Sequence, residues 1–187
     1  MRYACIISKY LIVNKHSSFL NLLPHEIELL MEKFGPCDVI DKEERIPANF
    51  DPRNAEIALG SCVIVKDRDG KIVLIRQSVS RPDLDIEHWF FVCGKMETGE
   101  SLEETGVREV YEEIGCVVRI SGIHHVGHHY VMVGGNKHSI YYGAALITDL
   151  VSGTPRVNSK EVSEVAAFTR LPENFAPQHR KYYPDLC

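Results

Sequence analysis

The sequence lacks the features that mark membrane, exported and nucleic-acid-coating proteins. It has no run of about 18 apolar residues, the length that a membrane-spanning helix needs. The apolar start, MRYACIISKYLIVNK, is interrupted by Ser8, Lys9 and Asn14 and has no small-residue cleavage site. Lysine and arginine number 21 against 26 aspartate and glutamate residues, so the basic excess of a general nucleic-acid binder is missing. We therefore expect a cytoplasmic protein that neither spans membranes nor binds nucleic acids in general.

The cysteines lack any C-x-x-C pair. Disulfide frameworks and zinc knuckles use clustered cysteines, so neither is predicted. A chain of 187 residues can bury a sizeable core without such crosslinks. We expect reduced thiols that mostly pack in the core at the six scattered positions, which are Cys5, Cys37, Cys62, Cys93, Cys116 and Cys187.

The order of apolar patterns predicts an α+β fold built on a mixed sheet. Two β-rich runs, 57–65 and 71–76, flank the turn sequence Asp67–Gly70, which is typical of a hairpin. A helix is predicted at 102–114. Further strands are predicted at 116–126, 130–133, 140–147 and 165–169, and a short helix near the C-terminus.

Residues 1–55 form an N-terminal extension to a domain that we place at 56–187. Within the extension, Pro24 opens a short amphipathic helix that Gly35 and Pro36 end. The charged stretch 41–53 contains two prolines and is predicted to be a connecting segment. The extension is expected to act as a dimerisation or lid segment.

The predicted helix at 102–114 carries the most informative chemistry. Ser101 and Glu104 form a capping-box pattern at its start. Glu109, Glu112 and Glu113 fall within roughly a 100° arc of the helix surface. Carboxylates this close repel one another unless a cation lies among them, and Mg²⁺ prefers oxygen ligands. A solvated acidic helix face is the alternative interpretation of the charges alone.

The spacing from Gly94 to Cys116 decides between these interpretations. It fits the pattern G-x5-E-x7-R-E-U-x-E-E-x-G-U, where U is a bulky apolar residue, at every fixed position, with Cys116 in the last U position. This segment, which we call the Nudix box, resembles the signature of the Nudix hydrolase family. The resemblance implies an α/β/α sandwich and a Mg²⁺- or Mn²⁺-dependent enzyme. Such an enzyme attacks phosphorus with water and cleaves a nucleoside diphosphate linked to another moiety, as in an NTP, a dNTP or a nucleotide sugar such as ADP-ribose.

The resemblance also implies roles for individual residues. The metal ligands would be the Gly94 carbonyl, Glu109, Glu112 and Glu113. Arg108 would position a glutamate, Glu100 would support it, and Glu109 or Glu112 would take part in catalysis. The catalytic base in this family often lies outside the box, at a place where this chain has Glu161 and Glu164. Both of these glutamates could equally be solvated.

Residues outside the box could bind substrate. Arg76 and Arg81 could meet a phosphate or sugar, although a structural use is equally open. In the resembling family, residues before the final helix line a base pocket in several branches. Phe175, Gln178 and His179 occupy that region here, where an aromatic face can stack and an amide can contact a base edge.

Four histidines lie within residues 124–129. On a regular strand His124 and His128 would share a face. Metal ligation, contact with substrate and ordinary surface positions all remain open for them, although Mg²⁺ favours oxygen over imidazole.

Two alternative functions stay open, besides the expected small-molecule nucleotide substrate and a homodimer that the family resemblance allows. One is hydrolysis of GDP-mannose at the sugar carbon, which the context of Arg81–Pro82 and Trp89–Phe91 faintly resembles, although that branch has a degraded box. The other is a non-catalytic regulator of Nudix fold that binds nucleotide. A complete glutamate set argues against it.

Overall fold

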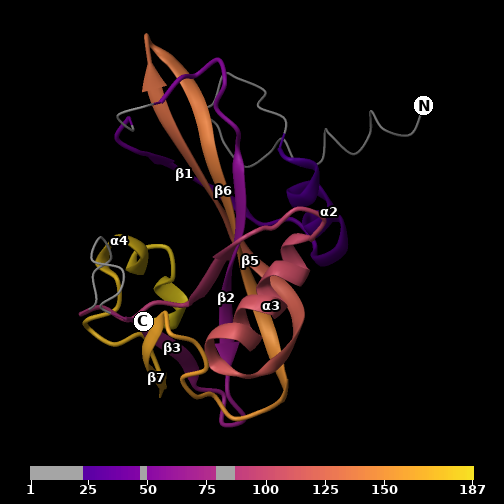
Figure 1. Cartoon of the computed structure of the whole chain (residues 1–187), viewed down its shortest axis with the longest axis vertical. Helices are drawn as coiled ribbons and strands as arrows, with labels where there is room; N and C mark the ends of the chain where they lie inside the picture. The colour runs from indigo at the N-terminus through magenta and orange to yellow at the C-terminus, as the bar shows by residue number, and fades with distance from the viewer. Residues whose placement is uncertain (1–22, 47–49, 79–86) are drawn as a thin grey trace.

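The described strands form one mixed sheet in the order β1-β5-β6-β2-β3-β7, with β4 paired to β2. This computed structural model describes residues 23–46, 50–78 and 87–187 (Figure 1). Its elements are α2 (His25–Phe34), β1 (Asp38–Glu43), β2 (Ala58–Lys66), β3 (Ile72–Gln77), β4 (Val92–Lys95), α3 (Leu102–Ile114), β5 (Val117–Val133), β6 (Asn136–Ser152), β7 (Val162–Phe168), α4 (Pro177–Arg180) and the 3₁₀ helix η1 (Pro184–Leu186).

Two hairpins build most of the sheet. Strands β2 and β3 pair antiparallel across the predicted turn, where the Asp67 carboxylate accepts from the backbone N–H groups of Asp69 and Lys71. Strands β5 and β6 each run for 17 residues and meet at Gly134–Gly135, both with positive φ. The prediction of two separate strands at 116–126 and 130–133 is wrong in one respect, because the two segments form one continuous strand, β5.

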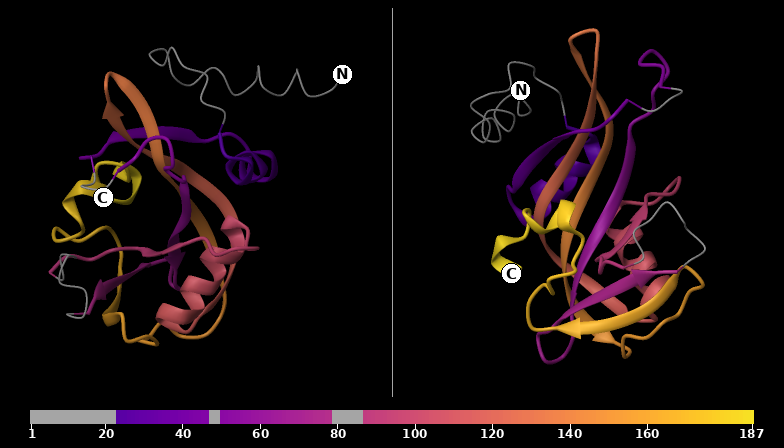
Figure 2. Two further views of the ribbon diagram at one scale, coloured as in Figure 1. Left: turned by 45° about the horizontal axis from the view of Figure 1, so that its top comes forward. Right: turned by 90° about the vertical axis from the view of Figure 1, so that its left-hand side faces the viewer.

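Helices cover both faces of the sheet. In Figures 1 and 2, α2 and α3 lie on one side, and α4 with the C-terminal segment lies on the other. Ile27 of α2 and Leu102 of α3 share a buried cluster with Tyr142 and Leu146 of β6. The opposite face buries an aromatic cluster that includes Trp89, Phe91, Phe175 and Tyr183. This arrangement confirms the predicted α+β class and the helix–sheet–helix layering.

The described part of the expected N-terminal extension packs on the main domain. The predicted helix is present as α2, and β1 adds a parallel edge strand that pairs with β5 from Asp38–His125 to Glu43–Tyr130. The connecting segment predicted at 41–53 is therefore wrong at its start, because residues 41–43 belong to β1. A parallel partner 87 residues away leaves no local signal in sequence. No helix in the described ranges is long and apolar enough to cross a membrane.

One cysteine pair departs from the expectation of reduced thiols. Cys62 on β2 lies directly opposite Cys93 on β4, with a Cα–Cα distance of 4.2 Å, and the two form a disulfide. Cys116 is buried as expected, Cys37 is half-buried and Cys187 is exposed. Cys5 lies outside the described residues. The pair was missed because its 31-residue separation matches no motif, and only the pairing of β2 with β4 brings the two together.

Candidate active site

The N-terminal end of α3 is fixed by its own sequence and by the sheet beneath it. The predicted capping box is present: the Ser101 hydroxyl accepts from the Glu104 N–H, and the Glu104 carboxylate accepts from the Ser101 N–H at 2.8 Å. Ser61 on β2, fully buried, donates from its hydroxyl to the Leu102 carbonyl. The first turn of α3 is therefore held in one place on β2.

The C-terminal end of α3 is held by a loop that sequence reasoning missed. The helix stops at Gly115, which has φ 68° and caps the Tyr111 carbonyl, as predicted. Asn158 then donates from its side-chain amide to the carbonyls of Tyr111 and Glu112, at 3.0 and 3.4 Å, and from its backbone N–H to the Glu113 carbonyl. An asparagine in a loop 44 residues past the end of the helix gives no signal in sequence, so only the structure reveals this contact.

Arg108 joins three glutamates of the box into one cluster. Its guanidinium donates to Glu100 at 2.6 and 3.0 Å, to Glu109 at 2.7 Å and to Glu112 at 3.2 Å. A fifth bond, 3.1 Å long, reaches the Lys95 carbonyl on β4. The fork of arginine donors suits this arrangement, since it can meet several carboxylate oxygens in one plane.

The cluster has opposite effects on two of its carboxylates. Donation from Arg108, with the Glu97 N–H, lowers the pKa of Glu100 to about 2. Burial raises the pKa of Glu109 above its usual value despite the bond from Arg108, and the charges of Glu112 and Glu161 raise it further. Glu109 therefore lies where negative charge accumulates in a poorly solvated place.

Gly94 lies against this cluster, because a side chain built on it would overlap the Glu109 carboxylate. Glu113, on the same helix, is only 5% exposed, whereas Glu112 is largely solvent-accessible. The structure thus brings Glu100, Arg108, Glu109 and Glu112 together beside Gly94, whereas Glu113 is buried on the same helix.

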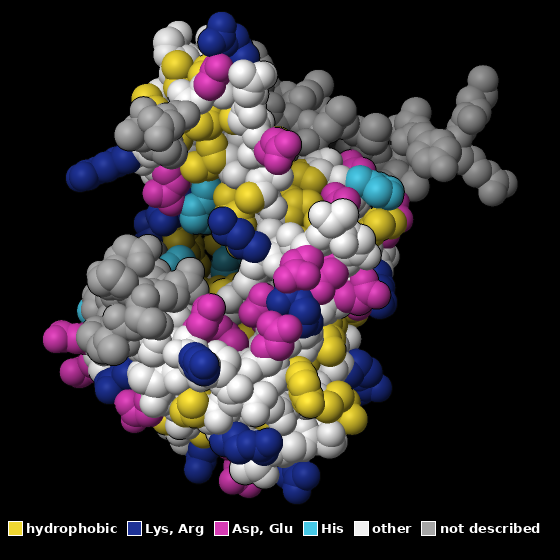
Figure 3. Space-filling view, in the orientation of Figure 1, with side chains coloured by type: hydrophobic (Ala, Val, Ile, Leu, Met, Phe, Trp, Pro, Cys, Tyr) yellow, Lys and Arg dark blue, Asp and Glu magenta, His cyan; other side chains and the backbone are white. Residues whose placement is uncertain are grey.

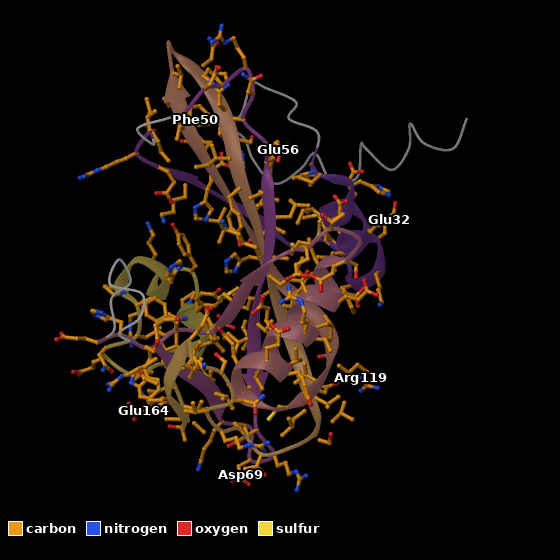
Figure 4. All side chains as sticks on the ribbon, in the orientation of Figure 1. Glu32, Phe50, Glu56, Asp69, Arg119 and Glu164 are labelled. Carbon is orange, nitrogen blue, oxygen red and sulfur yellow. A yellow bond between two sulfur atoms is a disulfide. The ribbon has the colours of Figure 1, made fainter. Side chains whose placement is uncertain are left out.

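The structure separates the two candidate bases. Glu161 lies close enough to Glu109 for its charge to raise the pKa of Glu109. Glu164 instead pairs with Arg76 at 3.0 Å across β7 and β3, and it points away from α3 (Figure 4). Of the two carboxylates, Glu161 adds to the negative charge around Glu109, whereas Glu164 is held in an ion pair with Arg76.

The donor set fits a hard divalent cation. In the part of the chain that the structure describes, no three His, Cys, Asp or Glu side chains converge into a ready-formed ion site. The groups around Glu109 are nevertheless carboxylate oxygens whose charges repel one another, and such oxygens are the ligands that Mg²⁺ and Mn²⁺ prefer.

Comparison with known proteins agrees with this geometry. The family model described as NUDIX domain matches residues 57–186. The chain belongs to the Nudix family. This membership confirms that it is a Nudix hydrolase, as the box predicted. A search of curated proteins found no match.

Solved structures share the fold of this Nudix domain. The MutT protein of Methanosarcina mazei Go1 is similar with a TM-score of 0.54 and 19% identity, over 71% of this chain and 94% of that one. A MutT NUDIX hydrolase from Burkholderia pseudomallei gives 0.53 and 21%, over 71% and 99%. The family match and these structures together confirm the predicted Nudix fold.

The substrate-binding candidates outside the Nudix box do not come together in one site. Arg76 stacks over the Trp89 ring at 4.4 Å and pairs with Glu164, which is a structural use. Phe175 is 1% exposed and packs edge-on against Phe91, so its ring has no free face for a base. His179 lies on α4 near Lys42 and His129. Arg81 and the Gln178 side chain lie outside the described residues.

The histidine cluster of the Nudix domain splits between the two faces of the sheet. The register of β5 shifts between Ile123 and His125, and this irregularity places His124 beside His125. His128 lies on the other face, where it stacks on Tyr142 and bonds Asp41 and Ser139. The expectation that His124 and His128 share a face is wrong, because it assumed a regular strand.

Proposed function

We propose that this Nudix hydrolase is a Mg²⁺- or Mn²⁺-dependent pyrophosphohydrolase. Its substrate would be a nucleoside diphosphate linked to another moiety, namely an NTP, a dNTP or a nucleotide sugar such as ADP-ribose. The observation that carries the proposal is the carboxylate cluster of Glu100, Glu109 and Glu112, which Arg108 holds against Gly94. A pure binding module has no need of this set, and attack at the anhydride phosphorus does.

The residues around Glu109 have two roles, which are to hold the cation and to orient the groups that hold it. Glu109, Glu112, Glu113 and the Gly94 carbonyl would hold the cation. Bound there, the cation would neutralise the charge of the diphosphate and of the group that leaves it. Arg108 fixes the orientation of Glu109, because it donates to Glu109 and Glu100 at once. Glu100, with its pKa near 2, stays ionised and keeps Arg108 in place.

Glu161 is the carboxylate that we assign as proton acceptor for the attacking water. Glu161 lies in the loop before β7, where its backbone carbonyl accepts from the Ser78 N–H at 2.8 Å, and its charge acts on Glu109. A base must lie within hydrogen-bond reach of the water that it activates, and Glu164 on its outward-facing ion pair does not meet that condition.

A substrate panel tests the proposal. Purified protein is incubated in Mg²⁺ or Mn²⁺ with NTPs, dNTPs, ADP-ribose and GDP-mannose, and the products are read by phosphorus NMR in ¹⁸O-labelled water. We expect ¹⁸O in a phosphate product. Glu112→Gln should lower turnover by more than about 100-fold, above the usual effect of losing an outer partner of a metal site. Glu103→Gln is the matched control, because Glu103 faces Lys33 on the exposed side of the same helix.

Three outcomes would contradict the proposal. Free mannose with unlabelled GDP would indicate attack at the sugar carbon. Nucleotide binding in Mg²⁺ without any phosphate product would indicate a regulator. Full activity of Glu112→Gln would show that the metal site lies elsewhere.

A further inference from the structure

The Cys62–Cys93 pair lies next to the glycine that we assign to the cation. The two cysteines are directly opposite each other on β2 and β4, and the residue after Cys93 is Gly94. Cys93 is exposed, whereas Cys62 is half-buried against the aromatic cluster on its face of the sheet. A small thiol in solution can therefore reach the Cys93 sulfur, with Cys62 as the inner partner.

The pair lies on the other face of the sheet from the carboxylate cluster. Side chains alternate between the two faces along a strand. Ser61 bonds to the first turn of α3, so the neighbouring Cys62 points away from α3. Gly94 faces Glu109, and Cys93 before it faces away in the same manner. Any effect of the sulfurs on the carboxylates must therefore pass through the backbone of β4.

Strand β4 is short and has few other attachments. It has four residues, and among the described strands it pairs only with β2. Strand β2 is itself held along Ala58–Val65 by β6. Acidic side chains gather on the surface where β4 meets α3 (Figure 3). A disulfide from β4 to β2 thus ties the less supported strand to the better supported one.

Two carbonyls of β4 take part in the candidate site. The Gly94 carbonyl is a proposed ligand of the cation, and the Lys95 carbonyl accepts from Arg108 at 3.1 Å. The disulfide is one residue away from the first of these carbonyls and two from the second. Groups that are already fixed in place lose less conformational freedom when a ligand binds. The link should therefore favour binding of the cation.

We propose that Cys62 and Cys93 form a reversible disulfide switch that sets the cation affinity of the site. The proposal rests on the proposed function, because it acts through the Gly94 carbonyl as a metal ligand. In the disulfide form, β4 is joined covalently to β2 and the site binds the cation more tightly. In the dithiol form, hydrogen bonds and packing alone hold β4, and the site binds the cation more weakly.

The switch operates by thiol–disulfide exchange with a small-molecule thiol. The thiolate of that molecule attacks the Cys93 sulfur, the bond to Cys62 breaks, and Cys62 leaves as a thiolate that takes up a proton. A second small thiol attacks the mixed disulfide, which releases Cys93 as a thiol and forms the small-molecule disulfide. Two electrons thus pass to the protein. The same steps in reverse, with a small-molecule disulfide as oxidant, restore the link.

Equilibration of the native protein with glutathione tests whether the pair is reversible. The ratio of reduced to oxidised glutathione is varied, exchange is stopped with acid, and free thiols are alkylated in urea and located by mass spectrometry. We expect Cys62 and Cys93 to become free together as the ratio rises, and to be linked again when it falls. Cys116 is buried and should be free at every ratio.

Metal binding and hydrogen exchange measure the effect of the switch without turnover. Mn²⁺ is titrated into each redox form and free Mn²⁺ is read by electron paramagnetic resonance. We expect the disulfide form to bind Mn²⁺ about three-fold or more tightly than the dithiol form. Backbone amides of residues 92–96 should exchange about ten-fold more slowly in the disulfide form, because local opening of β4 is restrained.

Cysteine variants separate the pair from the other thiols. Cys93→Ser should bind Mn²⁺ as the dithiol form does, whatever the glutathione ratio. Cys187→Ser is the matched control, because Cys187 is an exposed thiol whose sulfur bonds the Tyr183 carbonyl, and it should respond as wild type does. The comparison of the two redox forms of wild type needs no variant, so a variant that fails to fold leaves the test intact.

The switch and the proposed function fail in different ways. A pair that stays in one state at every glutathione ratio, or equal Mn²⁺ affinity in the two forms, would overturn the switch and leave the hydrolysis proposal standing. A protein that forms no phosphate product in either redox form, yet binds Mn²⁺ more tightly as the disulfide, would contradict the proposed hydrolysis and support the switch.

Discussion

At the scale of single residues, Arg108 is the side chain on which the candidate site depends most. It makes five hydrogen bonds to Glu100, Glu109, Glu112 and the Lys95 carbonyl, and it is only 22% exposed. A lysine carries one ammonium and cannot span these acceptors. Arg108→Lys should therefore lower kcat by about 10- to 100-fold, the effect of losing an outer-shell partner, and raise the Mg²⁺ concentration for half-maximal rate.

Steady-state assays against Mg²⁺ concentration measure this effect. Arg119→Lys is the matched control, because Arg119 is 74% exposed and pairs with Asp149 on the surface. Activity of Arg108→Lys within three-fold of wild type would show that the arginine fork does not orient the site.

The role of a single residue could be predicted from the sequence only where a motif fixes the spacing between residues. The pattern from Gly94 to Gly115 selected Glu109 and Arg108, and the structure places them in contact. Cys62 and Cys93 carry no such pattern, since they lie on two strands that come together only in the sheet. Glu161 and Glu164 could not be told apart from sequence, because Glu161 lies in the loop before β7 and Glu164 on β7, and only the pairing of β7 with β3 gives Glu164 its partner Arg76.

At the scale of elements, helix α3 is held at both ends, and the two ends should respond differently to mutation. Asn158 ties the last turn, which carries Glu112 and Glu113, to the loop that continues into Glu161. Asn158→Ala should lower kcat by about 10-fold or more, because it frees two parts of the site from each other.

Ser101→Ala is the comparison for Asn158→Ala. It removes the cap at the far end of the helix and should cost about 1 kcal/mol in the free energy of unfolding, with little change in kcat of the folded enzyme. Urea unfolding and turnover are measured on both variants. Equal loss of kcat in both would mean that Asn158 acts only through the stability of the helix.

The bounds of a helix or hairpin could be predicted where capping and turn residues lie next to each other in the sequence. The capping box and Gly115 set the bounds of α3, and the Asp67–Gly70 turn set the β2–β3 hairpin. The parallel pairing of β1 with β5 and the register shift near His124 depend on contacts between distant segments, so a regular-strand assumption failed there.

At the scale of the whole molecule, buried histidines should make stability depend on pH. Burial lowers the folded-state pKa of His125, His128, His129 and His179 from 6.5, and the value for His125 falls to about 4. Between pH 7.5 and 5 the unfolded chain takes up protons that the folded chain does not, so the free energy of unfolding falls as the pH falls. His125, 7% exposed, should contribute at most about 2 kcal/mol over this range.

Urea unfolding of the nucleotide-free protein at several pH values between 7.5 and 5 measures the slope, and His125→Gln isolates one contribution. The charges of Asp38 and Asp185 partly oppose the effect of burial on His125, and the pKa of about 4 already includes their opposition. The variant should lose less stability than wild type on acidification. His138→Gln is the control, on β6 outside the buried set. If wild type and His125→Gln show the same slope, the proton uptake on unfolding lies in other groups and His125 is not held neutral in the folded state.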